Sequence, residues 1–124
     1  MIKQVNHISY LEKNMISINN NKLKIRNTDI EVSLSKNQKK LIICLMKDIN
    51  DKKRIITLIW GEGDSSLREM SYHQLIHKTR NRLSNHGFPD DFILTIPRYG
   101  LCLNKKFVGY TLKMQDLNYT HEFQ

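Results

Sequence analysis

The stretch from Ser66 to Gly87, followed by two apolar runs joined by a short turn, constrains the fold of this chain most strongly. Within it, apolar residues recur at steps of three and four between positions 72 and 83, the spacing of a helix buried along one side. The runs that follow, 92–96 and 101–103, have the length and composition of β-strands. We therefore expect a helix over about 67–85 beside a β-hairpin over about 92–103.

The two sides of this helix differ in chemistry. Its inner side is expected to carry Tyr72, Leu75, Ile76, Thr79 and Leu83. Its outer side collects imidazole, amide and cationic side chains, namely His73, Gln74, His77, Lys78, Asn81 and Arg82, with Arg80 toward the flank. Such a helix fits the major groove of B-DNA, where amides and cations read base edges and nearby cations pair with phosphates. A solvated basic helix has the same composition, so composition alone leaves both interpretations open.

The turn of the hairpin presents two residues suited to the same partner. Pro97 fixes the chain entering the turn, and Gly100 is expected to supply the backbone conformation that leaves it. Arg98 and Tyr99 would then project outward, where they suit phosphate or minor-groove contacts. An ordinary exposed turn is the alternative.

The charge of the whole chain favours a polyanionic partner. Its 124 residues support one domain and carry a formal net charge of +8, which favours nucleic acid over acidic lipid or acidic protein. Cys44 and Cys102 lack the spacing of a zinc site, so we expect buried, reduced thiols and a cytoplasmic location. The longest apolar run, Leu41–Met46, is far shorter than the roughly 18 residues of a membrane span, so we expect no membrane segment.

The region before the long helix is expected to hold a sheet and two shorter helices. Alternating apolar residues predict antiparallel strands within about 9–34, with turns at Asn19–Asn21 and Asn27–Asp29 and a further strand over Ser9–Asn14. A capping box, Ser35-x-x-Gln38, opens a helix over about 36–48, and Asn50-Asp51 offers the cap for another over about 52–60. Trp60 is expected to anchor the core, and Gly61–Asp64 ends the second helix. A second capping box, Ser66-x-x-Glu69, opens the long helix.

Catalytic and metal-site patterns are weak in this sequence. His73 and His77 have a spacing that can bind zinc, but the glutamate of a metalloprotease motif and a third ligand are missing. The sequence also lacks a nucleophile-base-orienter set and a glycine-rich phosphate loop. We therefore expect no metal, no cofactor and no enzymatic activity.

Several motifs together resemble the OmpR/PhoB-type winged-helix domain. The resemblance covers roughly residues 9–104 and is carried by Leu34-Ser35, Gln38, Leu41-Ile42, Leu45, Ile59-Trp60-Gly61, Ile76-x-x-Thr79-Arg80-x-x-Leu83 and Thr95-Ile96-Pro97-Arg98-Tyr99-Gly100. The last turn is more similar to the CadC/ToxR subgroup than to receiver-linked response regulators. The resemblance implies an α+β, winged helix-turn-helix fold with an N-terminal antiparallel β-sheet, four-stranded in that family, three helices and a C-terminal β-hairpin wing.

The resemblance also implies how each site residue acts. Members of the family bind duplex DNA, with the third helix in the major groove and the wing near the adjacent minor groove. By position, His73, Gln74 and Lys78 would approach bases, His77 and Arg80 would hold phosphates, and Arg98 and Tyr99 would form the wing tip, with Asn81 on the same DNA-binding face. The loop Gly61–Ser65 matches a segment that contacts RNA polymerase in some relatives.

Three departures from the family pattern stand out, and those at Thr79 and Leu101 motivate an alternative function. Thr79 and Leu101 replace the usual leucine and tyrosine, and the connection between the first two helices is short. Our expectation is a bacterial, cytoplasmic, sequence-specific DNA-binding transcriptional regulator that self-associates on DNA. The alternative is a winged-helix protein-protein interaction module with weak or no DNA binding.

The expected organisation is one winged-helix domain over 1–104 followed by a tail over 105–124. The tail contains apolar residues that would suit an extra strand or a dimerisation segment. A CadC/ToxR-like protein would also carry a membrane helix and a sensor domain. We therefore expect either a fragment of such a regulator or a small regulator that acts alone.

Overall fold

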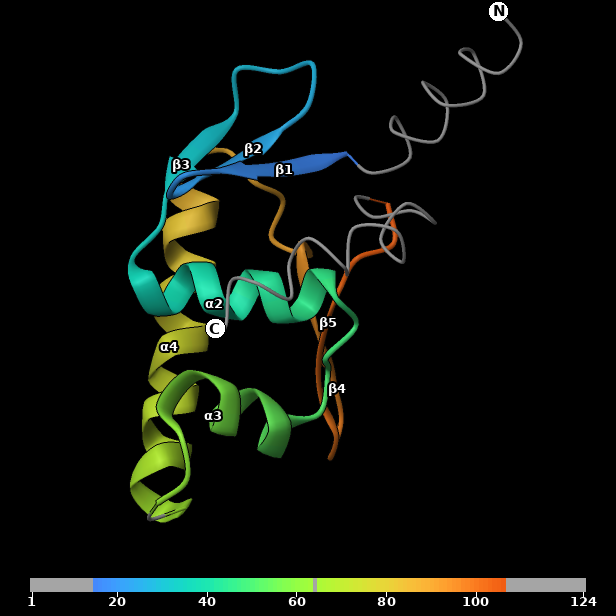
Figure 1. The fold of residues 1–124 in the computed structure, drawn as a ribbon. Helices are drawn as coiled ribbons and strands as arrows, with labels where there is room; N and C mark the ends of the chain where they lie inside the picture. The colour runs from blue at the N-terminus through green and yellow to red at the C-terminus, as the bar shows by residue number, and fades with distance from the viewer. Residues whose placement is uncertain (1–14, 64, 107–124) are drawn as a thin grey trace, which may run out of the picture.

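A computed structural model describes residues 15–63 and 65–106. The described residues form, in order, β1 (Ile16–Asn19), β2 (Lys22–Ile25), β3 (Glu31–Ser33), α2 (Lys36–Met46), α3 (Lys52–Trp60), α4 (Ser65–Asn85), β4 (Ile93–Ile96) and β5 (Gly100–Leu103) (Figure 1). The predicted α+β class is therefore confirmed, with a three-stranded antiparallel sheet before the helices and a hairpin after them. This topology fits an OmpR/PhoB-like winged helix.

The N-terminal sheet has the order β1-β2-β3 and both predicted turns. Asn20, in the first turn, adopts a φ of 58°, a left-handed conformation that asparagine tolerates better than most residues. In the second turn, the Thr28 hydroxyl donates to the Ile25 carbonyl at 2.7 Å and accepts from the Ile30 amide at 3.0 Å. The strand predicted over Ser9–Asn14 lies outside the described residues, as do residues 107–124 of the tail.

Helix α2 begins as predicted and ends two residues earlier than predicted. The Ser35 hydroxyl accepts from the Gln38 amide at 3.2 Å and the Gln38 side chain accepts from the Ser35 amide at 2.9 Å, which confirms the capping box. The helix stops at Met46 because Asp48 adopts a φ of 60° and the Ile49 amide donates back to the Cys44 carbonyl at 2.8 Å. This is the bond pattern of a Schellman C-cap, with aspartate in the usual glycine position.

Helix α3 matches its predicted bounds, whereas α4 starts two residues before its prediction. The Asp51 carboxylate caps α3 by accepting from the Arg54 amide at 3.0 Å, and Gly61 ends the helix with a φ of 80°. Because α4 already begins at Ser65, Ser66 lies within its first turn and not before it as predicted. The end of α4 follows the prediction, since Gly87 adopts a φ of 93° beyond its last residue.

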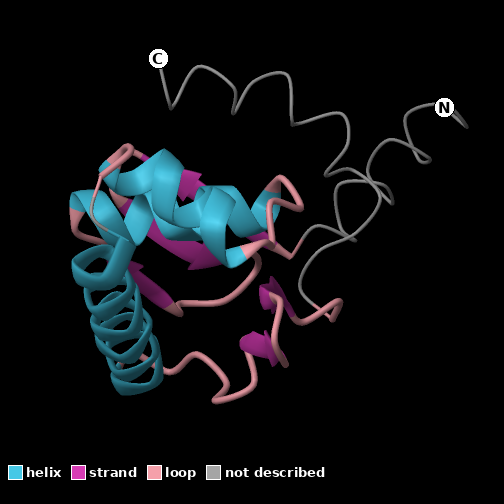
Figure 2. Cartoon of the chain, turned by 90° about the horizontal axis from the view of Figure 1, so that it is seen from below, coloured by secondary structure: helices cyan, strands magenta, loops and turns pink. Residues whose placement is uncertain are grey.

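The core lies between the sheet, the three described helices and the hairpin. In Figure 1 the sheet lies at one end, α2 crosses beneath it, and α4 runs from α3 toward the sheet, while the hairpin lies along the opposite side. Helices α2, α3 and α4 contact one another and form one cluster in Figure 2, and α2 also contacts β5. The apolar run Leu41–Met46 of α2 is buried, whereas Trp60 is half-buried against the core. None of the helices within the described ranges is long and apolar enough to cross a membrane.

Candidate nucleic-acid interface

Helix α4 buries the face that the sequence predicts. Tyr72, Leu75, Ile76, Thr79 and Leu83 are each at most 9% exposed. Thr79 is fully buried, and its hydroxyl donates to the Leu75 carbonyl one turn earlier at 2.6 Å. Because the hydroxyl is satisfied within the helix, threonine fits this position without an unpaired polar group.

The opposite face of α4 is exposed and rich in hydrogen-bonding side chains. Its exposed members are His73, Gln74, His77, Lys78 and Asn81. The Asn81 amide nitrogen lies 3.2 Å from His77 Nε2. Because Gln74, Lys78 and Asn81 point away from the core on one side of a straight element, they present a surface that fits a groove of duplex DNA.

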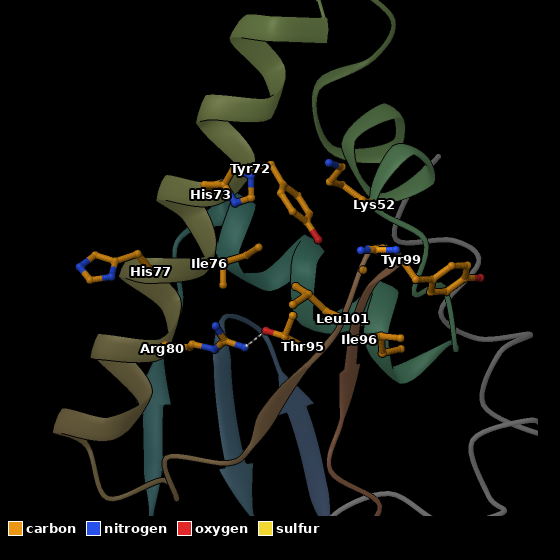
Figure 3. A pocket seen from close by; sticks show the side chains of 12 residues that line it. Lys52, Tyr72, His73, Ile76, His77, Arg80, Thr95, Ile96, Tyr99 and Leu101 are labelled. Carbon is orange, nitrogen blue, oxygen red and sulfur yellow. Dashed lines mark hydrogen bonds between the residues drawn. The ribbon is translucent and has the colours of Figure 1, made fainter.

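Arg80 lies at the junction between this face and the hairpin. Its Nη2 atom donates to the Ile93 carbonyl at 3.1 Å and to the Thr95 hydroxyl at 2.9 Å. Figure 3 shows the bond to Thr95. The side chain is half-buried, and both of its partners belong to β4. Arg80 therefore fixes the hairpin against α4. The sequence predicts only a phosphate contact for Arg80, so this structural role is an additional finding.

The tip of the hairpin projects as predicted, although glycine is needed there for a different reason. Arg98 and Tyr99 are exposed, and it is Arg98 that adopts the left-handed conformation, with a φ of 63°. Gly100 does not have a positive φ, so the prediction that it supplies the turn conformation is wrong. A Cβ atom at Gly100 would meet the Asn50 carbonyl oxygen at 1.7 Å, so glycine is required by the close approach of two backbones.

Two backbone hydrogen bonds hold the hairpin tip against the start of α3. The Lys52 amide donates to the Tyr99 carbonyl at 2.9 Å, and the Leu101 amide donates to the Asn50 carbonyl at 3.0 Å. Leu101 is itself only 2% exposed. The position of Arg98 and Tyr99 is therefore set by α3 as well as by the turn.

A groove of about 350 Å³ separates α4 from the hairpin. Its lining combines basic, hydroxyl-bearing and apolar side chains from α3, α4, the two strands of the hairpin and the turn between them, namely Lys52, Tyr72, His73, Ile76, His77, Arg80, Thr95, Ile96, Arg98, Tyr99, Gly100 and Leu101. Figure 3 shows Tyr72 and Ile76 directed from α4 toward the hairpin, while His77 points away from it. The groove brings five of the predicted site residues together, and Gln74, Lys78 and Asn81 lie outside its lining.

The electrostatics of the groove come from cations and one adjacent carboxylate. Lys52 Nζ donates to Glu69 Oε1 at 2.8 Å, and the same oxygen lies 3.9 Å from His73 Nε2. The hydrogen bond and positive charge of Lys52 lower the pKa of Glu69, which is therefore ionised at neutral pH. Burial raises the pKa of Tyr72 to about 12, so its hydroxyl is neutral in the groove.

The sequence does not predict the roles of Lys52 and Thr95. Both line the groove, Lys52 from the first position of α3 and Thr95 from β4. The only local signal for Lys52 is its place directly after a helix cap, which does not reveal the contact with Glu69. Gly61, Glu62 and Gly63 of the loop matched to an RNA polymerase contact are exposed, and Asp64 lies outside the described residues.

The residues that the structure describes do not place three or more histidine, cysteine, aspartate or glutamate side chains together as a metal site. Comparison of the sequence with models of protein families, with curated proteins and with solved structures finds no significant match. The arrangement of side chains on α4 and the hairpin is thus the basis for any assignment of function.

Proposed function

We propose that this chain is a sequence-specific duplex-DNA-binding transcriptional regulator of the OmpR/PhoB winged-helix type, without enzymatic activity. The observation that carries the proposal is the exposed face of α4 beside a groove whose other wall is the hairpin. Gln74, Lys78 and Asn81 lie where they would read base edges in the major groove. Arg98 and Tyr99 lie where they would contact the adjacent backbone or minor groove.

The charge of the protein supports the same proposal. A net charge of +8 attracts a polyanion over long range, and the basic groove concentrates part of this charge next to the face that would read bases. Self-association on DNA and contact of the Gly61–Ser65 loop with RNA polymerase belong to the proposal as further partners.

A salt titration tests the proposal directly. The probe is a library of labelled duplexes from the promoter regions of the source genome, and affinity is measured over a range of salt concentrations. Phosphate contacts release counterions, so each contact lowers the slope of log K against log salt by about 0.9. We expect Arg98→Ala to weaken binding to all duplexes evenly and to make the slope of log K against log salt less negative by about one unit.

Lys24→Ala is the matched control, because Lys24 is exposed on β2, outside the groove lining. This variant should bind duplex DNA with nearly the affinity of the parent, because it loses one positive charge far from the proposed interface. Absence of duplex binding at low salt, or equal losses in the Lys24 and Arg98 variants, would overturn the proposal.

A second candidate function is a winged-helix module that binds another protein. Thr79 and Leu101 do not favour it, because both fit the core. The observation that does favour it is the pair Leu67 and Met70, which are 63% and 61% exposed one turn apart on α4. Tight binding to a protein partner that Leu67→Ser with Met70→Ser abolishes, without DNA binding by the parent, would select this candidate.

A further inference from the structure

Lys52, the first residue of α3, connects this helix to the hairpin and to α4 at the groove. Its backbone amide donates to the Tyr99 carbonyl of the hairpin tip, and its ammonium donates to Glu69 of α4. The lysine side chain is 35% exposed and the glutamate side chain is 48% exposed, so both groups lie at a surface that a large ligand can reach. The Lys52–Glu69 pair therefore lies at the edge of the face assigned to DNA.

Glu69 is the one acidic residue in the sequence of α4, and one of its oxygens lies near two basic side chains of the groove lining. The residues that line the groove include five basic side chains and no acidic one. Glu69 thus holds an anionic oxygen 2.8 Å from Lys52 and 3.9 Å from His73. A phosphate oxygen of a DNA backbone would make the same kind of charge-assisted hydrogen bond to Lys52.

We propose that Glu69 is an internal counter-ion that competes with DNA phosphate for Lys52 and His73 and so limits the affinity of the interface. This inference rests on the proposed function. In the free protein the charge of Lys52 is already balanced by Glu69, so a phosphate that pairs with Lys52 does so in competition with this carboxylate. Glu69 also repels any phosphate that approaches the groove. Exposed ion pairs of this kind are weak enough for DNA to displace them.

Glu69→Gln is the decisive variant, because it removes the charge and keeps the shape. The amide oxygen of glutamine still accepts a hydrogen bond from Lys52, so a change in affinity reports charge and not geometry. We expect the variant to bind a short labelled duplex of mixed sequence about fivefold more tightly than the parent. The slope of log K against log salt should become steeper by about 0.9, because pairing of Lys52 with a phosphate then displaces one more condensed counterion from the DNA.

Two further variants separate this role from general charge effects. Glu62→Gln removes an equal charge from an exposed position outside the groove lining, and it should change the affinity and the slope much less. Lys52→Met removes the ammonium that pairs with Glu69. In this background, Glu69→Gln should therefore raise the affinity for the duplex by a smaller factor than it does in the parent. Thermal unfolding of each variant confirms that equal fractions are folded.

The outcomes distinguish this inference from the proposed function. If the parent binds duplex DNA and Glu69→Gln binds equally or less tightly, the counter-ion role is wrong while DNA binding stands. The counter-ion role is also wrong if Glu62→Gln raises the affinity as much as Glu69→Gln does. It is equally wrong if Glu69→Gln raises the affinity by the same factor in the Lys52→Met background as in the parent. If neither parent nor variants bind duplex DNA, the proposed function fails and the inference fails with it.

Discussion

At the scale of single residues, Gly100 is required by the space around it and not by its backbone angles. The Asn50 carbonyl oxygen occupies the place of its missing Cβ atom, and the neighbouring amides of Lys52 and Leu101 complete the contact. Gly100→Ala must therefore push the hairpin away from α3. We expect a loss of about 1–3 kcal/mol in the free energy of unfolding, measured by urea denaturation.

Gly63→Ala is the control for that prediction. A Cβ atom at Gly63 would meet only the end of the Arg68 side chain, at 3.2 Å, and a flexible side chain can move aside. A similar loss of stability in both variants would show that glycine flexibility, and not the approach of Asn50, explains the effect.

Arg98 combines an unfavourable backbone conformation with an exposed side chain. Its φ of 63° costs a residue with a Cβ atom about 1–2 kcal/mol relative to right-handed conformations. We expect Arg98→Gly to leave the free energy of unfolding unchanged or to raise it by up to about 1 kcal/mol, and to weaken DNA binding. Urea denaturation and a salt titration on the same samples test this, and a parallel loss of stability and affinity would contradict it.

At the scale of elements, the outer face of α4 divides into two parts. Gln74 and Lys78 lie outside the groove, whereas His73 and Arg80 line it. We expect Gln74→Ala or Lys78→Ala to change the relative affinity for DNA sequences by about 1–3 kcal/mol per affected base pair. Selection of bound duplexes from a randomised pool measures this preference.

Arg98→Ala is the comparison for these two variants, since it should lower the affinity without changing the order of preferred sequences. If all three variants select the same sequences as the parent, α4 does not read bases. The Arg80 variants are less suited to this comparison, because Arg80 also holds the hairpin through Ile93 and Thr95.

At the scale of the whole molecule, two buried acidic groups predict how stability depends on alkaline pH. Burial raises the pKa of Cys44 from 9.0 to about 12 and that of Tyr72 from 10.0 to about 12. Both groups therefore lose their protons more readily in the unfolded chain. Their contribution to stability is complete below about pH 9 and is lost as the pH rises toward about 12.

We expect the free energy of unfolding to fall above about pH 9, by at most about 1.4 kcal/mol per pH unit for each group. Urea denaturation between neutral and alkaline pH measures the loss. Cys44→Ala removes the cysteine contribution, so its stability should decline less steeply than that of the parent. An identical decline in both proteins would contradict the role assigned to the Cys44 thiol.

The topology and most element boundaries follow from local patterns in the sequence. The capping box of Ser35 and Gln38, the cap at Asp51 and the stop at Gly87 lie where hydrogen bonding and backbone preference require them. These features involve residues a few positions apart, so periodicity and turn composition are sufficient to predict them. The early end of α2 was missed because aspartate, at Asp48, takes the left-handed position usually held by glycine.

Only the part of the candidate site that lies on a single element could be predicted from the sequence. Periodicity along α4 separates the buried seam at Thr79 and Leu83 from the outer face at Gln74 and Lys78. It does not show that Arg80 is hydrogen-bonded to Thr95 or that Lys52 is paired with Glu69. These pairs join different elements, and their partners are far apart in the sequence.

The sequence by itself therefore determined which elements form and which face of α4 is buried, because both depend on short-range spacing of apolar and capping residues. Only the tertiary structure decided how the hairpin lies against α3 and α4, because that depends on which surfaces fit together. The fit of Gly100 against Asn50 places the Arg98 tip, and the Lys52–Glu69 pair places a carboxylate at the edge of a basic groove. Complementary shape and charge between distant segments leave no periodic pattern along the chain.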